Sequence, residues 1–222
     1  MKNIALILLG GKGKRMGNDI PKQFLKKNDI PIYIYAIKNY EDISAINDIV
    51  LVVHHDYIDN VKEDIKKYHI EKVRDIIHGG SERFISSYLG VKRCYELFGE
   101  NNNVLIADAV RPNTSRTIIL ANIFALIDAK AVLTAIKGDE EEKRIDTGHV
   151  RGYTHFLAQT PQSFNLGYIF NLYEKYINED DFFVTDEISI VEKEGDDYVI
   201  VEGEENNYKI TNPNDLERFL RS

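Results

Sequence analysis

Residues 4–17, IALILLGGKGKRMG, join a continuous apolar run to a loop that holds four glycines. A short apolar run that ends at turn residues is typical of a buried strand. Glycines let a backbone approach a ligand closely and turn its amides towards negative oxygens. Basic side chains outnumber acids around this loop: Lys12, Lys14, Arg15, Lys22, Lys26 and Lys27 against Asp19. The stretch therefore predicts a first strand whose carboxyl end carries a positively charged loop.

Further apolar runs alternate with amphipathic segments along the chain. Strands are expected at 48–54, 74–80, 103–112 and 197–203, with a further apolar run at 131–136. Helices are expected at 31–42, 56–70, 81–98, 164–177, 185–194 and 212–222. This alternation predicts an α/β fold, a mostly parallel, Rossmann-like twisted sheet flanked by helices.

Composition excludes several classes of protein. The 222 residues carry a formal net charge of −8, which argues against general nucleic-acid binding. Cys94 is the only cysteine, so an internal disulfide framework and a multi-cysteine zinc site are excluded. The histidines show no spacing suited to a metal site. No apolar run reaches the roughly 20 residues that a membrane span needs, so we expect no membrane partner and a cytoplasmic protein.

The polar stretch at 138–150, GDEEEKRIDTGHV, interrupts the alternation. It has no apolar face that could join a core, and apolar residues precede it at 131–136. We therefore expect a projecting β-arm at about 137–158 on a single domain that spans residues 1–222.

The glycine loop matches neither of two common phosphate-binding motifs. A Walker loop ends in Gly-Lys-Ser/Thr, but Asn18 follows Gly17. A dinucleotide fingerprint needs a third glycine where Met16 stands. The remaining feature is a glycine loop with Arg15, a rigid fork suited to phosphate, and Lys22, a mobile charge. These two cations could hold a triphosphate and neutralise charge that develops during nucleotidyl transfer.

Five segments, in order, resemble the cytidylyltransferases that make CDP-linked polyols, a family of the nucleotide-diphospho-sugar transferase type. They are LLGGKGKRMGNDIPKQF, GGSERFISS, ADAVRP, AQTPQSF and VTDEISIVE, and the chain closes with VEGEENNYKITNPNDL. The family includes enzymes for 2-C-methyl-D-erythritol 4-phosphate and for ribitol 5-phosphate. The resemblance runs nearly end to end and implies transfer of CMP from CTP to a polyol phosphate, with release of pyrophosphate.

The resemblance also implies roles for single residues. Arg15, Lys22 and Lys209 would be catalytic, with Lys22 beside the pentavalent α-phosphorus. Arg111, Arg151, Thr185 and Asp186 would bind the acceptor, and Asp108 would help to place Mg²⁺ or the ribose. CTP would contact a larger set: Leu9, Gly10, Gly11, Gly13, Lys14, Gly79, Gly80, Arg83, Ser86, Ala107 and Asp108. The family resemblance further implies a homodimer formed through the arm.

Departures from the family pattern lie on the acceptor side. Ala107 stands where a histidine is usual, and the arm lacks the expected Asp-Thr-x-Lys. The arginine expected ten residues before Gln162 is Gly152, with Arg151 one place away. The best single acceptor is 2-C-methyl-D-erythritol 4-phosphate, of isoprenoid precursor synthesis. Ribitol 5-phosphate or another alditol or sugar phosphate, for cell-wall or capsule polymers, is the alternative. A non-catalytic nucleotide-binding protein and a transferase that uses ATP or GTP are further hypotheses.

Overall fold

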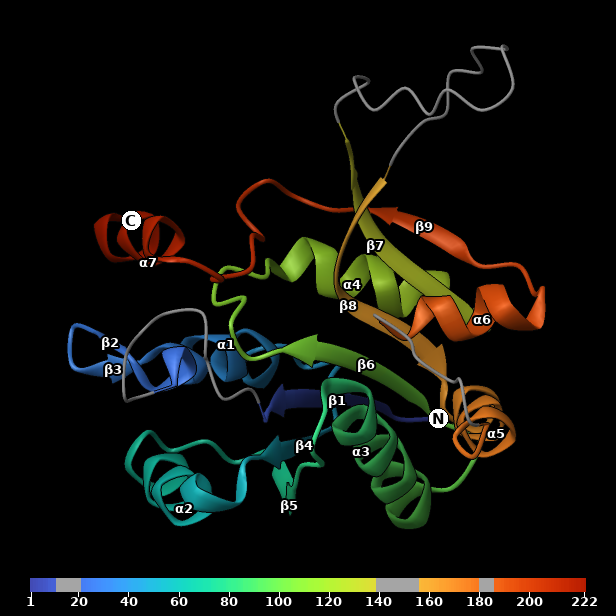
Figure 1. Cartoon of the computed structure of the whole chain (residues 1–222), viewed down its shortest axis with the longest axis horizontal. Helices are drawn as coiled ribbons and strands as arrows, with labels where there is room; N and C mark the ends of the chain where they lie inside the picture. Colours follow the sequence, from blue (N-terminus) through green and yellow to red (C-terminus); the bar gives the residue numbers. More distant parts are fainter. Residues whose placement is uncertain (11–20, 139–155, 180–185) are drawn as a thin grey trace.

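A seven-stranded sheet forms the centre of the molecule, which we describe from a computed structural model (Figure 1). The structure describes residues 1–10, 21–138, 156–179 and 186–222. The strand order is β5-β4-β1-β6-β8-β7-β9. The strands are β1 (Asn3–Leu9), β4 (Asp48–Val53), β5 (Val73–His78), β6 (Asn103–Asp108), β7 (Ala131–Lys137), β8 (Phe156–Asn165) and β9 (Val199–Glu202).

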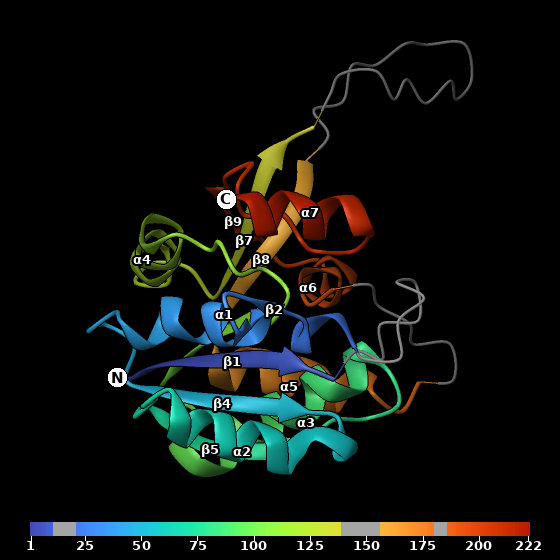
Figure 2. The same ribbon diagram turned by 90° about the vertical axis from the view of Figure 1, so that its left-hand side faces the viewer.

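Most neighbouring strands are parallel, as the sequence predicts. Strands β5, β4, β1 and β6 form one parallel block, in which Leu9 pairs with Val53 and Val53 with His78. Figure 2 shows β1 and β4 side by side and pointing the same way. Strand β8 is antiparallel to both of its neighbours, β6 and β7.

Helices cover both faces because the side chains of each strand alternate. Ile4, Leu6 and Leu8 of β1 pack into one buried cluster, with α3 (Arg83–Phe98), α5 (Leu166–Tyr176) and α6 (Ile188–Glu194). Ala5, Ile7 and Leu9 face the other cluster, with α1 (Ile32–Glu41), α2 (Ile58–Lys67) and α4 (Arg116–Ala125). Burial of these apolar faces supplies most of the driving force for the fold.

The last helix closes a smaller cluster beside the sheet. Helix α7 (Pro213–Arg221) buries Phe219 against Ile32, Val110 and Ile210. Asn212 caps it, since the Asn212 side chain accepts from the Asp215 amide and the Asp215 carboxylate accepts from the Asn212 amide. This capping box with a first-turn proline confirms the predicted helix start.

Three predictions of local structure were wrong or incomplete. The helix expected from residue 164 begins at Leu166, because β8 continues to Asn165 between β6 and β7. Helix α4 was missed, although Ser115 caps it by accepting from the Ile118 amide. Two short strands, β2 (Lys26–Lys27) and β3 (Ile30–Pro31), and two 3-10 helices, η2 (Lys22–Phe24) and η3 (His55–Tyr57), were also missed.

The base of the predicted arm is an antiparallel pair, in which Lys137 of β7 lies opposite Phe156 of β8. Residues 139–155, the greater part of the arm, lie outside the described residues. The division into a single domain with an arm stays a prediction. Within the described part of the chain, no helix is both long enough and apolar enough to cross a membrane.

Candidate active site

The carboxyl ends of β1, β5 and β6 lie at one edge of the sheet, as the sequence analysis predicts. Leu9 of β1 pairs with Val53, which pairs with His78 at the end of β5, and Leu8 pairs with Asp108 at the end of β6. Ligands of open α/β sheets bind at this edge. The glycine loop, the Gly79-Gly80 turn and Asp108 therefore start from neighbouring positions.

The turn after β5 is held by Ser86, near the start of α3. The Ser86 hydroxyl accepts from the Gly80 amide at 3.0 Å and donates to the Glu82 carbonyl at 2.9 Å. A Cβ atom added at Gly79 would lie 2.9 Å from Ser86 Oγ, and one at Gly10 would lie 3.2 Å from the same atom. Ser86 thus brings the turn that is predicted to contact CTP close to the start of the glycine loop, and the missing side chain of Gly79 leaves room for Ser86.

A buried carboxylate, Asp108, lies among three cations. Lys209 Nζ lies 2.9 Å from Asp108 Oδ2, Arg83 Nε lies 3.3 Å from Oδ1, and Arg111 Nε lies 3.8 Å from Oδ2. The Asp108 amide also donates to Thr160 Oγ1 of β8 at 3.1 Å. The cluster brings together residues with three predicted roles. Lys209 is predicted to be catalytic, Arg83 to bind CTP and Arg111 to bind the acceptor.

Glu187 is the part of this cluster that sequence reasoning missed. Arg83 donates to both Glu187 carboxylate oxygens, at 2.7 and 3.1 Å, and the Glu187 side chain is only 1% exposed. The Asp186-Glu187 pair before α6 was a signal, but the family pattern drew attention to Thr185 and Asp186 instead. With Glu187 counted, three cations face two carboxylates, and the described cluster keeps one surplus positive charge.

Burial and charge oppose each other at Asp108. Burial alone would raise the pKa of Asp108, but Lys209, Arg83 and Arg111 hold that pKa well below its usual range. Burial acts to lower the pKa of Arg83, yet Glu187 and Asp108 raise it well above its ordinary value. The pKa of Arg111 is lowered by burial and by Arg83, against the attraction of Asp108. Asp108 is therefore ionised at neutral pH, and the cluster holds its charges in fixed positions.

The remaining described site residues lie in different surroundings. Lys22 begins η2, and the next side chain, Gln23, is buried and donates to the Leu9 carbonyl at 2.9 Å. This bond ties the Lys22 segment to the end of β1. Leu9 and Ala107 are buried in the core, so contact with a ligand would involve their backbone.

Asp186 takes part in local bonds before α6. Its carboxylate accepts from Gln162 Nε2 at 3.1 Å and from the Ser189 amide at 3.1 Å. Gln162 in turn accepts from the Ile188 amide at 2.9 Å. The predicted acceptor-binding role of Asp186 stays a prediction. Gly11, Gly13, Lys14, Arg15, Arg151 and Thr185 lie outside the described residues.

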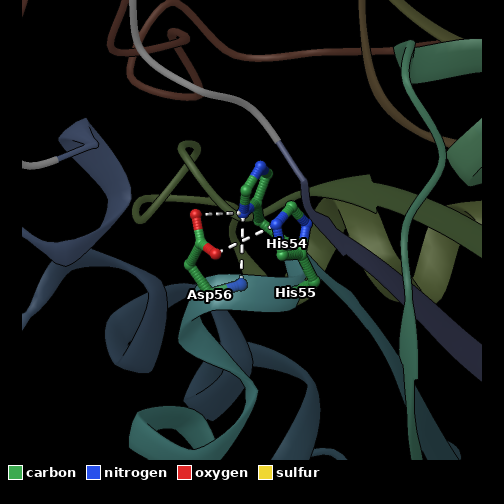
Figure 3. Close-up of side chains that lie close together, drawn as sticks. All are labelled: His54, His55 and Asp56. Carbon is green, nitrogen blue, oxygen red and sulfur yellow. Dashed lines mark hydrogen bonds and ion pairs between the residues drawn. The ribbon is translucent and has the colours of Figure 1, made fainter.

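A second polar cluster, of His54, His55 and Asp56, follows β4 (Figure 3). His54 Nδ1 lies 3.4 Å from Asp56 Oδ2, and His55 Nε2 lies 3.0 Å from Asp56 Oδ1. The Asp56 amide donates to His54 Nδ1, so the lone pair of that nitrogen is engaged in capping η3. The two rings stack with centroids 4.2 Å apart, and one nitrogen or oxygen of each of the three side chains lies within 4.8 Å of the others. Capping of η3 explains these contacts.

A cavity of about 510 Å³ opens beside the loop that follows β6. Its lining is largely polar and includes Arg116, Glu204, Tyr208 and Arg218. None of the site residues predicted from the sequence lines it. Within the described residues, the charged cluster around Asp108, and not this cavity, brings predicted site residues together.

Comparison with known proteins identifies the family of the chain. A family model described as 2-C-methyl-D-erythritol 4-phosphate cytidylyltransferase matches residues 3–219. The chain belongs to this family. The proteins of that name from Syntrophus aciditrophicus and Clostridium botulinum (strain Loch Maree) are 34% identical over 229 residues and 37% identical over 222 residues. These alignments cover 99% and 97% of this chain, and 96% and 94% of the relatives.

Solved structures of the family show the same fold. The 4-diphosphocytidyl-2C-methyl-D-erythritol synthase of Anaerococcus prevotii superposes with a TM-score of 0.83 at 30% identity, covering 99% of this chain and 95% of its own. The 2-C-methyl-D-erythritol 4-phosphate cytidylyltransferase of Francisella tularensis superposes with a TM-score of 0.80 at 27% identity, covering 99% and 98%. These matches confirm the predicted family and α/β fold.

Proposed function

We propose that this chain transfers CMP from CTP to 2-C-methyl-D-erythritol 4-phosphate, with release of pyrophosphate. The observation that carries the proposal is the cluster around Asp108, which holds Arg83, Arg111 and Lys209 at the ligand-binding edge of the sheet. Membership of the cytidylyltransferase family makes the chain a CTP-dependent nucleotidyltransferase. The relatives named above carry the erythritol compound in their names, and none names ribitol.

The reaction needs charge stabilisation and positioning rather than covalent catalysis. A phosphate oxygen of the acceptor attacks the α-phosphorus of CTP, a new P–O bond forms, and the bond to pyrophosphate breaks. Negative charge develops on the oxygens around that phosphorus, where Arg15 and Lys22 would stabilise it. Lys209 and Arg111, fixed by Asp108, would hold the acceptor phosphate in line.

Mg²⁺ is the cofactor that we propose. Asp108 is a hard oxygen ligand, and magnesium is usually held by one or two carboxylates together with substrate phosphates. Asp108 would hold the ion together with the phosphates of the nucleotide, beside Lys209 and Arg83. When bound, the ion would neutralise charge on the triphosphate.

A homodimer formed through the arm is the assembly that we propose. Phe156 and Leu157, where β8 leaves the base of the arm, are 48% and 57% exposed. A dimer formed through the arm would cover exposed apolar side chains at this place. Sedimentation equilibrium of the full chain would test the dimer, and substitution of both residues by serine should shift it to monomer. A cytoplasmic location also stays a prediction.

Pyrophosphate release tests the function directly. The purified full chain should release pyrophosphate from CTP with 2-C-methyl-D-erythritol 4-phosphate, and far less with ribitol 5-phosphate or other alditol phosphates. Parallel reactions with ATP, GTP and UTP should be much slower. Faster turnover of ribitol 5-phosphate would overturn the acceptor, and equal use of the four nucleotides would overturn the choice of base. Binding of CTP without turnover of any acceptor would indicate a non-catalytic protein.

A further inference from the structure

Asn207 is a fully buried amide beside the cluster around Asp108. Its Oδ1 accepts from Thr114 Oγ1 at 2.9 Å, and its Nδ2 donates to Gln159 Oε1 at 3.0 Å and to the Thr160 carbonyl at 2.9 Å. Its own carbonyl accepts from Arg111 at 2.6 Å. Few side chains could make this set of bonds, because an amide offers an acceptor and two donors together.

These bonds connect Asn207 to Arg111 and Asp108 of the charged cluster. Arg111 is held directly, through the Asn207 carbonyl. Asp108 is held through Thr160, whose hydroxyl accepts from the Asp108 amide while its carbonyl accepts from Asn207. Lys209 stands two residues after Asn207 in the same segment. Displacement of Asn207 would therefore move the partners of Asp108 relative to one another.

The amide of Gln159 fixes which way Asn207 can point. Gln159 Nε2 donates to the Glu204 carbonyl at 2.9 Å, and Gln159 Oε1 accepts from the Glu204 amide. If Gln159 turned over, its oxygen would face the Glu204 carbonyl. An aspartate at 207 would place carboxylate oxygen against Gln159 Oε1 and the Thr160 carbonyl, leaving buried acceptors without donors.

We infer that Asn207 is a positioning residue, which holds Lys209 and Arg111 at the spacing that the acceptor phosphate requires. The inference rests on the proposed function. A reacting phosphate that is misplaced by about 1 Å can lose on the order of 10²-fold in rate. The effect should fall mainly on the acceptor, because the Gly79-Gly80 turn, which is predicted to contact CTP, is held by Ser86 and not by Asn207.

Steady-state kinetics of Asn207→Asp in the full chain test this inference. We expect kcat/KM for 2-C-methyl-D-erythritol 4-phosphate to fall about 10²-fold, with a raised KM for that acceptor. The affinity for CTP, measured by calorimetry without acceptor, should change much less than the acceptor KM, because Asn207 reaches Asp108 only through Thr160. All variants are assayed well below their own unfolding temperatures, so that lost stability is not counted as lost activity.

Asn122→Asp is the matched control. Asn122 is also fully buried, and it donates to the Ile118 carbonyl at 2.9 Å and to Thr134 Oγ1 at 2.8 Å. Among the described residues, Asn122 makes no hydrogen bond to Asp108, Arg111 or Lys209. Its variant should lose stability as Asn207→Asp does, while the acceptor KM stays unchanged. The exposed neighbour variant Asn206→Asp should change neither quantity.

A milder variant, Thr114→Val, keeps the inference testable if Asn207→Asp does not fold. It removes the hydroxyl that donates to Asn207 and keeps the side-chain shape, so the acceptor KM should rise in the same direction by less. If Asn207→Asp and Thr114→Val affect the acceptor KM no more than Asn122→Asp, the positioning role is wrong. If the unsubstituted chain releases no pyrophosphate, the proposed function fails instead.

Discussion

The guanidinium of Arg83 and the carboxylate of Glu187 form a two-pronged ion pair that joins α3 to the start of α6. The pair spans 104 residues of sequence. Its two parallel hydrogen bonds leave the remaining Arg83 Nε to face Asp108 at 3.3 Å. The geometry of the candidate site thus depends on a contact between two helices on one face of the sheet.

Replacement of Glu187 by glutamine should destabilise the protein by about 3 kcal/mol, because Arg83 loses one of its two buried carboxylate partners. Urea unfolding followed by circular dichroism measures this change in the free energy of unfolding. As a control, Asp59→Asn removes the exposed partner of Lys62 on α2 and should leave the unfolding midpoint unchanged. If both substitutions lower the free energy of unfolding equally, the ion pair between α3 and α6 stabilises the protein no more than an exposed pair does.

Lys22→Ala should lower kcat by on the order of 10²-fold or more, since a charge aimed at the transition state is removed. The fold should persist, because the bond that ties this segment to the end of β1 is made by Gln23 and not by Lys22. Stopped assays of pyrophosphate release measure the rate. Lys26→Ala, an exposed change on β2, is the control. An unchanged kcat in Lys22→Ala would contradict the role given to Lys22.

The stability of the protein should fall at low pH because of Asp108, whose pKa is held low by three neighbouring cations in the folded protein. In the unfolded chain an aspartate titrates at about 3.9. Above that pH both states are ionised and the stabilisation is complete; as the pH falls below about 4 towards the folded pKa, the stabilisation is lost.

Urea unfolding at a series of pH values between about 2 and 6 measures this loss. The free energy of unfolding should fall more steeply below pH 4 in the natural protein than in Asp108→Asn. At neutral pH the asparagine variant should be the less stable of the two. If the free energy of unfolding falls equally steeply with pH in both proteins, Asp108 has the same pKa in the folded and unfolded states.

Cys94 should be inert in the folded protein. It is fully buried on the inner side of α3, and burial raises the pKa of its thiol. A thiol reagent such as Ellman's reagent at pH 8 should react with native protein only as fast as the protein unfolds, and at once in urea. Rapid reaction of the native protein would show that α3 opens away from the sheet.

The sequence alone was sufficient to predict the strands of the parallel block and the edge of the sheet at which the candidate site lies. Apolar runs such as residues 4–9 and 48–53 predict buried strands, and parallel strands carry their ends to one edge whatever packs around them. The glycine loop and the motif order also identified the family, which the comparisons confirm. These features depend on local composition and on chain order, both of which a single sequence records.

Only the tertiary structure decided the antiparallel place of β8 and the partners of the charged residues. No strand was predicted around Thr160, and the segment becomes a strand because β6 and β7 both pair with it. Glu187 and Asn207 gain their importance from contacts with Arg83 and Arg111, which lie about a hundred residues earlier in the chain. Burial gives these bonds their weight, and burial is set by packing across the whole sheet, which no local stretch of sequence determines.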